Sequence, residues 1–292
     1  MNWLNTLRSK VRRDILLSKH TTFKIGGKAD FFVEPINLED LRKLLMIAKD
    51  KKLRIFIIGQ GSNILVHDEG VRGIVVKFNS EYFRKIRLLY NCLKVGAGVK
   101  LNEVLQFCLK KGLSGLEFLI GIPATVGGAL VMNAGGRWGC IGERVKEVKV
   151  MDYNGNIKKI KSQDLRFSYR YSNLRRFIIL EVLLKLVKAD KEEILKKINY
   201  FLRYRKLTQD LSYPSAGCIF KNPKGLSAGE LIELCGLKGK TIGDARVSLR
   251  HANFIINQGN ASAKDVLSLI DYIRDKVKKK FNLDLELEIE IW

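Results

Sequence analysis

The stretch Gly59-Gln60-Gly61-Ser62-Asn63 decides how the first part of this chain is expected to fold. It directly follows Arg54-Ile55-Phe56-Ile57-Ile58, a short apolar run that is typical of a strand ending at a glycine loop. Successive backbone N–H groups in such a turn form a nest for anions, and the Ser and Asn side chains can add donors. The stretch is not the dinucleotide motif Gly-x-Gly-x-x-Gly, because Ile64 occupies the place of the third glycine. On its own, the loop is equally compatible with an ordinary turn between two strands.

A second loop that contains glycines favours the anion site over an ordinary turn. It is Gly121-Ile122-Pro123-Ala124-Thr125-Val126-Gly127-Gly128-Ala129. Pro123 stiffens the entry to an expected helix, and Thr125 can cap the first turn of that helix. Gly127 and Gly128 allow a ligand or a neighbouring backbone to approach closely. Two loops of this kind can hold a pyrophosphate from both sides, so together they predict a site for a phosphate-containing ligand.

The length and the apolar pattern indicate a globular protein with more than one domain. A chain of 292 residues is long for a single core, so two or three domains are expected. The longest apolar run, 177–187, is interrupted by Glu181 and Lys185 and is shorter than the about 18 residues that a membrane span needs. Residues 1–13 mix apolar with basic side chains and lack the apolar core of a signal peptide. We therefore expect a cytoplasmic protein without a membrane partner.

The charge and the cysteines bear on the class of partner. The net charge of +23 leaves a nucleic-acid binder as an alternative, since cationic surface gains affinity through counterion release. The lysines are spread along the chain, however, and no nucleic-acid motif is present, so we expect no nucleic-acid partner. The number of cysteines is odd, and no Cys-x-x-Cys pair occurs. This argues against a disulfide framework and against a structural metal site, so we expect free thiols and no metal.

Three structural units are expected along the chain, at residues 1–80, 81–188 and 189–292. The first is a small α/β layer with a helix over 37–52. The second contains a hairpin in which residues 145–151 and 156–161 flank Asn154-Gly155, a strong turn signal.

The third unit is expected to begin with a basic amphipathic helix over 190–206 and to end with a strand over 284–292. The core side of that helix is predicted to consist of Ile194, Ile198, Phe201 and Leu202.

Two further motifs complete the pattern. They are Phe167-Ser168-Tyr169-Arg170-Tyr171-Ser172 and Tyr213-Pro214-Ser215-Ala216-Gly217-Cys218-Ile219-Phe220-Lys221-Asn222-Pro223, in which a turn of small residues presents one thiol. Together with the two glycine loops, and in this order, they resemble the UDP-N-acetylenolpyruvoylglucosamine reductase family. The resemblance runs from about Ser18 to Trp292, and the length is similar to that of the family's short form, which lacks an extra loop.

The resemblance implies an α+β fold. It consists of an FAD-binding domain of the vanillyl-alcohol-oxidase type, in two α/β subdomains, and a C-terminal α+β substrate-binding domain. It also implies a flavoenzyme that uses FAD and NADPH. Such an enzyme reduces the enolpyruvyl group of a UDP-sugar, UDP-N-acetylenolpyruvoylglucosamine, to give UDP-N-acetylmuramate in peptidoglycan synthesis. The alternative within this fold is a flavin oxidase that acts on another substrate. We expect the protein to be a monomer.

The resemblance assigns the cofactor to the two glycine loops and to a third segment. The implied cofactor-binding residues are Gly59, Gln60, Gly61, Ser62, Asn63, Gly121, Ile122, Ala124, Thr125, Gly127, Gly128, Asn133 and Gly135. Ala124 stands where the family usually has glycine. The implied substrate-binding residues are Tyr169, Arg203, Lys206, Gln209 and Asn222. Arg203 and Lys206 suit phosphates, and a solvated basic helix face is nearly as good an interpretation of these two.

Reduction of an enolpyruvyl ether needs a hydride source, a cation against the carboxylate and a proton donor for the neighbouring carbon. Reduced flavin supplies the hydride. The resemblance implies Arg170 for the carboxylate, Cys218 as the proton donor in place of the family's usual serine, and Glu288 as the third catalytic residue. A guanidinium can hold a carboxylate in a bidentate fork, and a free thiol has a pKa of about 8.5, far below that of an alcohol.

Each of these three residues also has a simpler interpretation. Cys218 alone is more typical of a small buried apolar residue, and Arg170 alone of a surface ion pair. Glu288 lies in a strand-like row in which Asp284, Glu286, Glu288 and Glu290 share one parity, which is typical of the solvent side. Only the resemblance selects Glu288 from that row.

Overall fold

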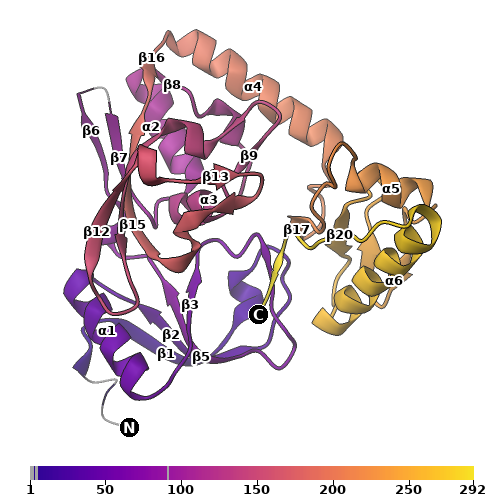
Figure 1. The fold of residues 1–292 in the computed structure, drawn as a ribbon, viewed down its shortest axis with the longest axis horizontal. Helices are drawn as coiled ribbons and strands as arrows, with labels where there is room; N and C mark the ends of the chain where they lie inside the picture. Colours follow the sequence, from indigo (N-terminus) through magenta and orange to yellow (C-terminus); the bar gives the residue numbers. More distant parts are fainter. Residues whose placement is uncertain (1–2, 4–5, 91) are drawn as a thin grey trace. The chain divides into compact units, whose positions relative to one another are not determined.

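The computed structural model describes residues 3, 6–90 and 92–292, and it divides the chain into two compact units. Both units combine helices and strands (Figure 1). Unit 1 comprises Met1–Arg13, Asp30–Gln60 and Arg72–Arg203, and unit 2 comprises Asp14–Ala29, Gly61–Val71 and Tyr204–Trp292. The predicted division at 1–80, 81–188 and 189–292 stays a prediction.

The first sheet has the strand order β1-β2-β5-β3. Its strands are β1 (Lys10–Leu16), β2 (Lys28–Glu34), β5 (Val71–Lys77) and β3 (Ile55–Ile58), and β3 runs parallel to β5. Helix α1 (Leu38–Asp50) follows β2, and Asn37 caps it by accepting a hydrogen bond from the Asp40 backbone N–H. Its leucines at 41, 44 and 45 are buried, as the 3.6-residue period predicts. The helix predicted over 37–52 is confirmed.

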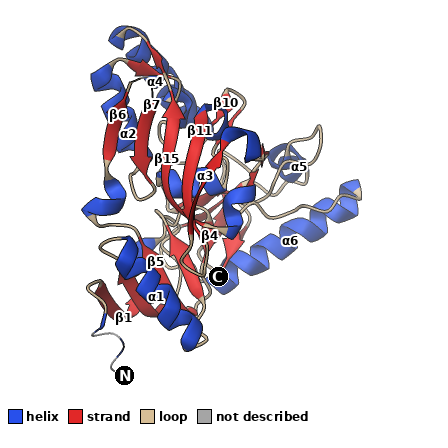
Figure 2. Ribbon diagram, turned by 60° about the vertical axis from the view of Figure 1, so that its left-hand side comes forward, coloured by secondary structure: helices blue, strands red, loops and turns tan. Residues whose placement is uncertain are grey.

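A second, five-stranded antiparallel sheet forms the rest of the core of unit 1 (Figure 2). In the order β12-β11-β15-β7-β6, its strands are Ile157–Lys161, Val145–Met151, Ile178–Lys185, Cys92–Gly96 and Ile86–Leu89. Helix α2 spans Leu101–Lys111, and α3 (Val126–Val131) packs against β15 and β7. The hairpin predicted about Asn154-Gly155 is confirmed as β11–β12, with Gly155 at the φ of +87° that a tight turn favours.

Unit 1 also contains short elements and most of a long helix. The short strands are β8 (Leu113–Ser114), β9 (Gly135–Gly136), β10 (Gly139–Cys140), β13 (Phe167–Ser168), β14 (Tyr171–Ser172) and β16 (Val187–Lys188). Among the described residues, short 3-10 helices are η2 (Leu17–His20), η3 (Glu81–Arg84), η4 (Glu117–Leu119), η5 (Ile141–Arg144), η6 (Ser162–Asp164) and η7 (Asn173–Arg176).

Helix α4 (Lys191–Thr208) confirms the predicted amphipathic helix, although its core side is narrower than predicted. Ile194 and Ile198 are buried and Phe201 packs partly against the core of unit 1. Leu202 is exposed, so its place in the predicted core stripe is wrong. The part of α4 that packs against the core of unit 1 ends at Phe201. The ring of Phe201 packs edge-on against Trp138, with ring centroids 5.2 Å apart.

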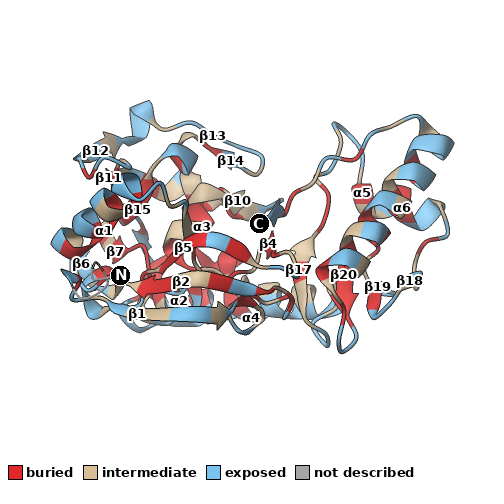
Figure 3. Cartoon of the chain, turned by 90° about the horizontal axis from the view of Figure 1, so that it is seen from below, coloured by how far each residue is buried: buried red, intermediate tan, exposed pale blue. Residues whose placement is uncertain are grey.

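Unit 2 is built on a four-stranded antiparallel sheet in the order β17-β20-β19-β18. Its strands are β17 (Ser215–Cys218), β20 (Phe254–Asn257), β19 (Ala245–Val247) and β18 (Thr241–Ile242), and its helices are α5 (Ala228–Leu234) and α6 (Ala263–Phe281). Ser227 and Ser262 cap the two helices through their hydroxyls. The buried face of α6 packs into the core of this unit, where most of the sheet is also buried (Figure 3).

The C-terminal segment of unit 2 differs from the prediction. Instead of one strand over 284–292, only β21 (Glu290–Ile291) forms a ladder, parallel to β4 (Ile64–Leu65). The segment changes partners along its length, because the Ile219 carbonyl accepts from the Glu288 N–H at 2.8 Å before β21 turns to β4. A strand whose partner changes cannot keep a continuous ladder, and this is why the strand pattern in the sequence overestimated its length. Within the described residues, we find no helix with both the length and the apolar character needed to cross a bilayer.

Candidate active site

The two glycine loops meet in unit 1 through Gly59 and Thr125. A Cβ atom added at Gly59 would lie 2.6 Å from the Thr125 Oγ1, so a side chain at this position would collide with the second loop. Thr125 caps α3 as predicted, because its Oγ1 accepts a hydrogen bond from the Gly128 N–H at 3.3 Å. Two segments far apart in the sequence are therefore in contact at the point where a phosphate-containing ligand was expected.

The backbone donors at the start of α3 are mostly used by the protein itself. The Val126 N–H donates to the Val99 carbonyl at 2.8 Å, and the Gly127 N–H donates to the Ala97 carbonyl at 2.9 Å. A Cβ at Gly127 would also lie 3.1 Å from the Ala97 Cβ, so close packing within the chain explains this glycine. At Gly128, by contrast, the nearest atom to an added Cβ is the Thr125 Oγ1 at an ordinary 3.6 Å. Gly128 is thus the glycine of this loop that packing within the chain does not require.

We expect Gly128→Val to weaken FAD binding by about tenfold or more, since a branched side chain would occupy space that the chain leaves open for a ligand. The apoprotein should keep its melting temperature within a few degrees, because valine has a better helix propensity than glycine and the added Cβ would lie 3.6 Å from its nearest neighbour, the Thr125 Oγ1. Titration of the apoprotein with FAD measures the dissociation constant. Gly136→Ala is the matched control, because nothing lies within 4 Å of its added Cβ and it is not a predicted ligand. Unchanged affinity in Gly128→Val would remove Gly128 from the cofactor site.

The backbone conformation and close packing at Gly61 require glycine whether or not a ligand is bound. It lies in unit 2 with a φ of +64°, and an added Cβ would come within 2.4 Å of the His20 carbonyl oxygen and 2.8 Å of the Thr21 Cα. A larger residue there would disturb the fold in addition to any cofactor. Its neighbour Asn63 donates from Nδ2 to the Glu288 carbonyl at 3.0 Å, so the first glycine loop also holds the C-terminal segment.

The third predicted cofactor segment braces a hairpin. Asn133 is buried with a φ of +45°, its Nδ2 donates to the Ser168 carbonyl at 3.0 Å, and its Oδ1 accepts from the Gly142 N–H at 3.1 Å. These bonds tie the segment that follows α3 to β13 and to η5. The structure thus gives Asn133 a part in supporting the Arg170 hairpin, and its contact with FAD stays a prediction.

Arg170 occupies a strained position at the tip of the β13–β14 hairpin. Ser168 pairs with Tyr171, which leaves Tyr169 and Arg170 as the two-residue loop. Arg170 has a φ of +54°, a left-handed conformation that costs a residue with a side chain about 1–2 kcal/mol. Its Nη1 donates to the Gly135 carbonyl at 3.1 Å, and its own carbonyl accepts from Arg175 Nη2 at 3.0 Å. Backbone strain that a network of bonds maintains is typical of functional positions.

Cys218 ends an irregular strand. In β17, Ser215 is opposite Ile256 and Cys218 is opposite Phe254, so two residues of β17 face one residue of β20 in a bulge. Gly217 within this bulge has a φ of +77°, and an added Cβ there would meet nothing within 4 Å. Bulges next to active sites commonly redirect a side chain.

The thiols of the chain differ in their surroundings. Cys218 is half-buried, whereas Cys108 is buried in the core of unit 1, where burial raises the pKa of its thiol to about 12. Burial also raises the pKa of Cys140 and of Cys235. The interpretation as a small buried apolar residue therefore describes Cys108 better than Cys218.

Glu288 is buried although its neighbours of the same parity are exposed. It is 9% exposed, whereas the Glu286 side chain is 76% exposed and pairs with Lys221. The interpretation of Glu288 as a residue on the solvent side of a strand is therefore wrong. Its backbone N–H bonds to the carbonyl of Ile219, the residue after Cys218, so the structure brings Glu288 next to the thiol strand within unit 2.

The predicted substrate-binding residues are less closely grouped. Arg203 and Lys206 are exposed on α4, and Gln209, just beyond its end, accepts from Arg205 Nη1 at 3.4 Å. Asn222 accepts from the Ala228 N–H at 3.0 Å, which gives it a part in starting α5. Tyr169 is exposed at the hairpin tip, with the Arg170 guanidinium 5.5 Å from its ring centroid. Their contacts with a substrate stay predictions.

Asn253 and His251 precede β20 and support the Cys218 strand. The sequence predicts a structural role for His251 and none for Asn253. Asn253 is buried, and its side chain bonds to both the N–H and the carbonyl of Phe220, at 2.9 and 2.8 Å. His251 Nδ1 accepts from the Asn253 N–H at 3.3 Å, and burial lowers the pKa of His251. A buried polar side chain that pairs with backbone cannot be recognised from residue type alone.

Unit 2 should lose stability in mild acid through His251. Because burial lowers its pKa below 6.5, the unfolded chain binds a proton more readily than the folded one. The contribution of His251 to the free energy of unfolding should be complete above its unfolded pKa and should fall as the pH drops below it. Urea unfolding at several pH values measures this slope, and His251→Gln should reduce it. If the free energy of unfolding of His251→Gln depended on pH as steeply as that of the wild type, His251 would not be the source of the acid sensitivity.

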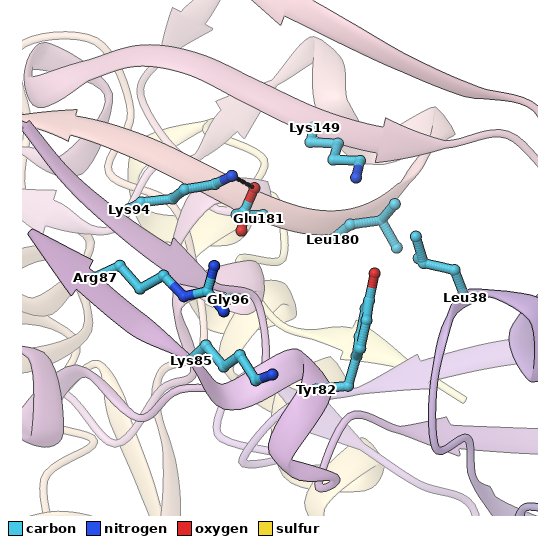
Figure 4. A pocket seen from close by; sticks show the side chains of 9 residues that line it. All are labelled: Leu38, Tyr82, Lys85, Arg87, Lys94, Gly96, Lys149, Leu180 and Glu181. Carbon is cyan, nitrogen blue, oxygen red and sulfur yellow. Dashed lines mark ion pairs between the residues drawn. The ribbon is translucent and has the colours of Figure 1, made fainter. Parts of the chain in front are cut away.

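A pocket in unit 1 is lined by none of these residues (Figure 4). Its volume is about 190 Å³, and it is lined by Leu38, Tyr82, Lys85, Arg87, Lys94, Gly96, Lys149, Leu180 and Glu181. Lys94 bonds to Glu181 at 2.9 Å, and Lys149 is opposite Glu181 across β11 and β15. These are the cross-strand charge pairs of a solvated sheet face. Among the residues that the structure describes, no group of three or more His, Cys, Asp or Glu side chains could hold a metal ion.

Both parts of the chain match models of known protein families. Residues 29–161 match the model of an FAD binding domain, so the chain is a flavoprotein. Residues 209–292 match the model of the UDP-N-acetylenolpyruvoylglucosamine reductase C-terminal domain. A reductase of this name from Moorella thermoacetica is 45% identical over 98% of this chain and 94% of its own length, and one from Clostridium novyi is 42% identical over 97% and 92%. The chain belongs to the UDP-N-acetylenolpyruvoylglucosamine reductase family and is an FAD-containing oxidoreductase.

Solved structures confirm the predicted fold class. The crystal structure of UDP-N-acetylenolpyruvylglucosamine reductase from Thermus caldophilus has a TM-score of 0.85 and 40% identity, and the match covers 97% of this chain and 99% of that one. A solvent-stable cholesterol oxidase has a TM-score of 0.51 and 17% identity over 62% of this chain and 38% of its own. The likeness to the cholesterol oxidase shows that the two proteins share a fold, and it carries no information about activity or substrate.

Proposed function

We propose that this protein reduces the enolpyruvyl group of UDP-N-acetylenolpyruvoylglucosamine with NADPH, giving UDP-N-acetylmuramate for peptidoglycan synthesis. The observation that carries this proposal is the buried Glu288 next to the Cys218 strand, within a domain that matches the family's C-terminal model. The protein is proposed to act as a monomer in the cytoplasm.

The residues of the glycine loops fit FAD. Gly128 leaves open the space that a Cβ would fill, and Gly59 lets the first loop touch the second. The two loops and the segment about Asn133 and Gly135 would hold the cofactor. FAD supplies the hydride of the reaction when it is bound.

Arg170 is proposed to hold the substrate carboxylate. Charge builds on this carboxylate as the double bond is reduced, and a guanidinium fork stabilises it best when it is oriented in advance. The bonds of Arg170 to Gly135 and Arg175 provide that orientation from both the side chain and the backbone.

Cys218 is proposed to give its Sγ proton to the substrate carbon next to the one that receives hydride. One hydride and one proton thus convert the carbon–carbon double bond into a single bond, and solvent returns the proton to the thiolate. Glu288 is proposed as the third catalytic residue, because its buried carboxyl group lies beside the thiol strand. Tyr169, Arg203, Lys206, Gln209 and Asn222 are proposed to contact the UDP-sugar.

The proposed activity is tested by incubating the purified protein with NADPH and UDP-N-acetylenolpyruvoylglucosamine. A product with two more hydrogen atoms than the substrate, formed in proportion to the NADPH consumed, is expected. Two further observations separate the alternatives. A flavin oxidase would consume oxygen with another substrate, and a nucleic-acid binder would lack a flavin spectrum and bind DNA with steep salt dependence. Purified protein that lacks flavin and reductase activity would overturn the proposal.

A further inference from the structure

We propose that Thr22 is a positioning residue for proton transfer, because its hydroxyl holds the bulge that presents Cys218. This inference rests on the proposed function, in which Cys218 is the proton donor. Thr22, the glycine loop from Gly61 and the Cys218 strand all lie in unit 2. No substrate or cofactor contact is assigned to Thr22.

The hydroxyl of Thr22 supports the free edge of the Cys218 strand. β17 is at the edge of its sheet, with β20 on one side. Thr22 Oγ1 donates to the carbonyl of Ser215, the first residue of β17, at 2.7 Å. This short bond joins residues far apart in the sequence. Ser215 is the last regularly paired residue before the bulge, and Cys218 is the first one after it. The bond therefore fixes the strand at the point where the bulge begins.

Little packing restrains Gly217 within the bulge, whereas its neighbour Ala216 is buried in the core of unit 2. A Cβ at Gly217 would meet nothing within 4 Å, and the Gly217 N–H donates to the Ser215 hydroxyl at a long 3.5 Å. Beyond Cys218, the Ile219 N–H donates to the Asn253 carbonyl at 2.9 Å. Thr22 and Asn253 thus hold the two ends of the segment that carries the thiol.

Thr22 also connects this strand to the first glycine loop. Its backbone N–H donates to the Gly61 carbonyl at 3.1 Å, and in the same loop Asn63 donates to the Glu288 carbonyl. The loop therefore supports both the thiol strand, through Thr22, and the backbone of Glu288, through Asn63. A donor that is misplaced by about 1 Å can lose on the order of 100-fold in rate, so this support has a kinetic consequence.

Thr22→Val keeps the branched shape and removes the hydroxyl. In the holoenzyme, the rate at which substrate reoxidises the NADPH-reduced flavin should fall roughly 10- to 100-fold at saturating substrate, whereas flavin reduction by NADPH and the KM for the sugar should change little. Thr22→Ser should restore most of the rate. The matched control is Thr21→Val, because the adjacent Thr21 hydroxyl bonds to the Ile25 carbonyl at 3.0 Å and not to the Cys218 strand.

A double-mutant cycle separates positioning from a general structural effect. If Thr22 acts through the thiol, Thr22→Val should cause no further loss in a Cys218→Ala background. Amide exchange gives a second readout, since Thr22→Val should speed exchange at Ile219 in the apoprotein while core amides of α6 keep their protection. Equal losses in both half-reactions, or an additive loss in the Cys218→Ala background, would overturn the inference. If Cys218→Ala alone reoxidises normally, the proton-donor role fails instead.

Discussion

Cys218→Ala is expected to separate the two half-reactions of the enzyme. Reduction of the flavin by NADPH needs no proton donor at the substrate carbon, so it should proceed near the wild-type rate. Reoxidation by the enolpyruvyl sugar does need that donor, and it should slow by roughly 10²- to 10⁴-fold, the usual value of positioned general acid catalysis. Anaerobic stopped-flow absorbance of the flavin measures each step separately.

Cys218→Ser is the control for this prediction. A hydroxyl can occupy the same position at the end of the bulge, so serine should recover much of the reoxidation rate. Cys108→Ala is a second control, because that thiol is buried in the core of unit 1 and should affect only stability. Rapid reoxidation of Cys218→Ala would make Cys218 a packing residue and would move the proton to Glu288 or to water.

Arg170→Lys is expected to lose about 10²- to 10³-fold in kcat, more than its retained charge suggests. Lysine keeps a cation but loses the planar fork that matches a carboxylate. It carries a Cβ as arginine does, so the left-handed backbone at this position costs both residues a similar amount. Steady-state kinetics with the enolpyruvyl sugar measure the loss.

The matched control is Arg176→Lys, an exchange of the same kind at an exposed residue whose guanidinium lies 5.1 Å from the Phe177 ring centroid. It should keep wild-type kcat. If Arg170→Lys also turned over at the wild-type rate, Arg170 would have no part in stabilising the carboxylate.

Local signals in the sequence predicted the regular elements well. A cap and a 3.6-residue period at Asn37 predicted α1, and the Asn154-Gly155 turn predicted the β11–β12 hairpin. Such features depend on neighbouring residues, so they survive in almost any tertiary context. The resemblance to a known family then supplied the fold class, which no periodicity in the chain would have identified.

Long-range contacts explain what the sequence did not predict. The charge parity at 284–290 indicated a solvent-facing row, but Glu288 is buried because the segment changes its partner from the 219–221 region to β4. Asn133 and Asn63 were predicted as cofactor ligands, and the structure shows each bonded to a distant backbone carbonyl. Only the folded chain reveals which backbone group such an amide meets, so their contact with FAD stays a prediction.

The central claim is that this flavoprotein passes its reducing equivalents to an enolpyruvyl sugar. The most direct test is to reduce the wild-type holoenzyme with one equivalent of NADPH without oxygen and then to add UDP-N-acetylenolpyruvoylglucosamine. The account predicts that the oxidised flavin spectrum returns within the time of one turnover and that UDP-N-acetylmuramate forms in an amount equal to the flavin. A flavin that stays reduced until oxygen is admitted would contradict it.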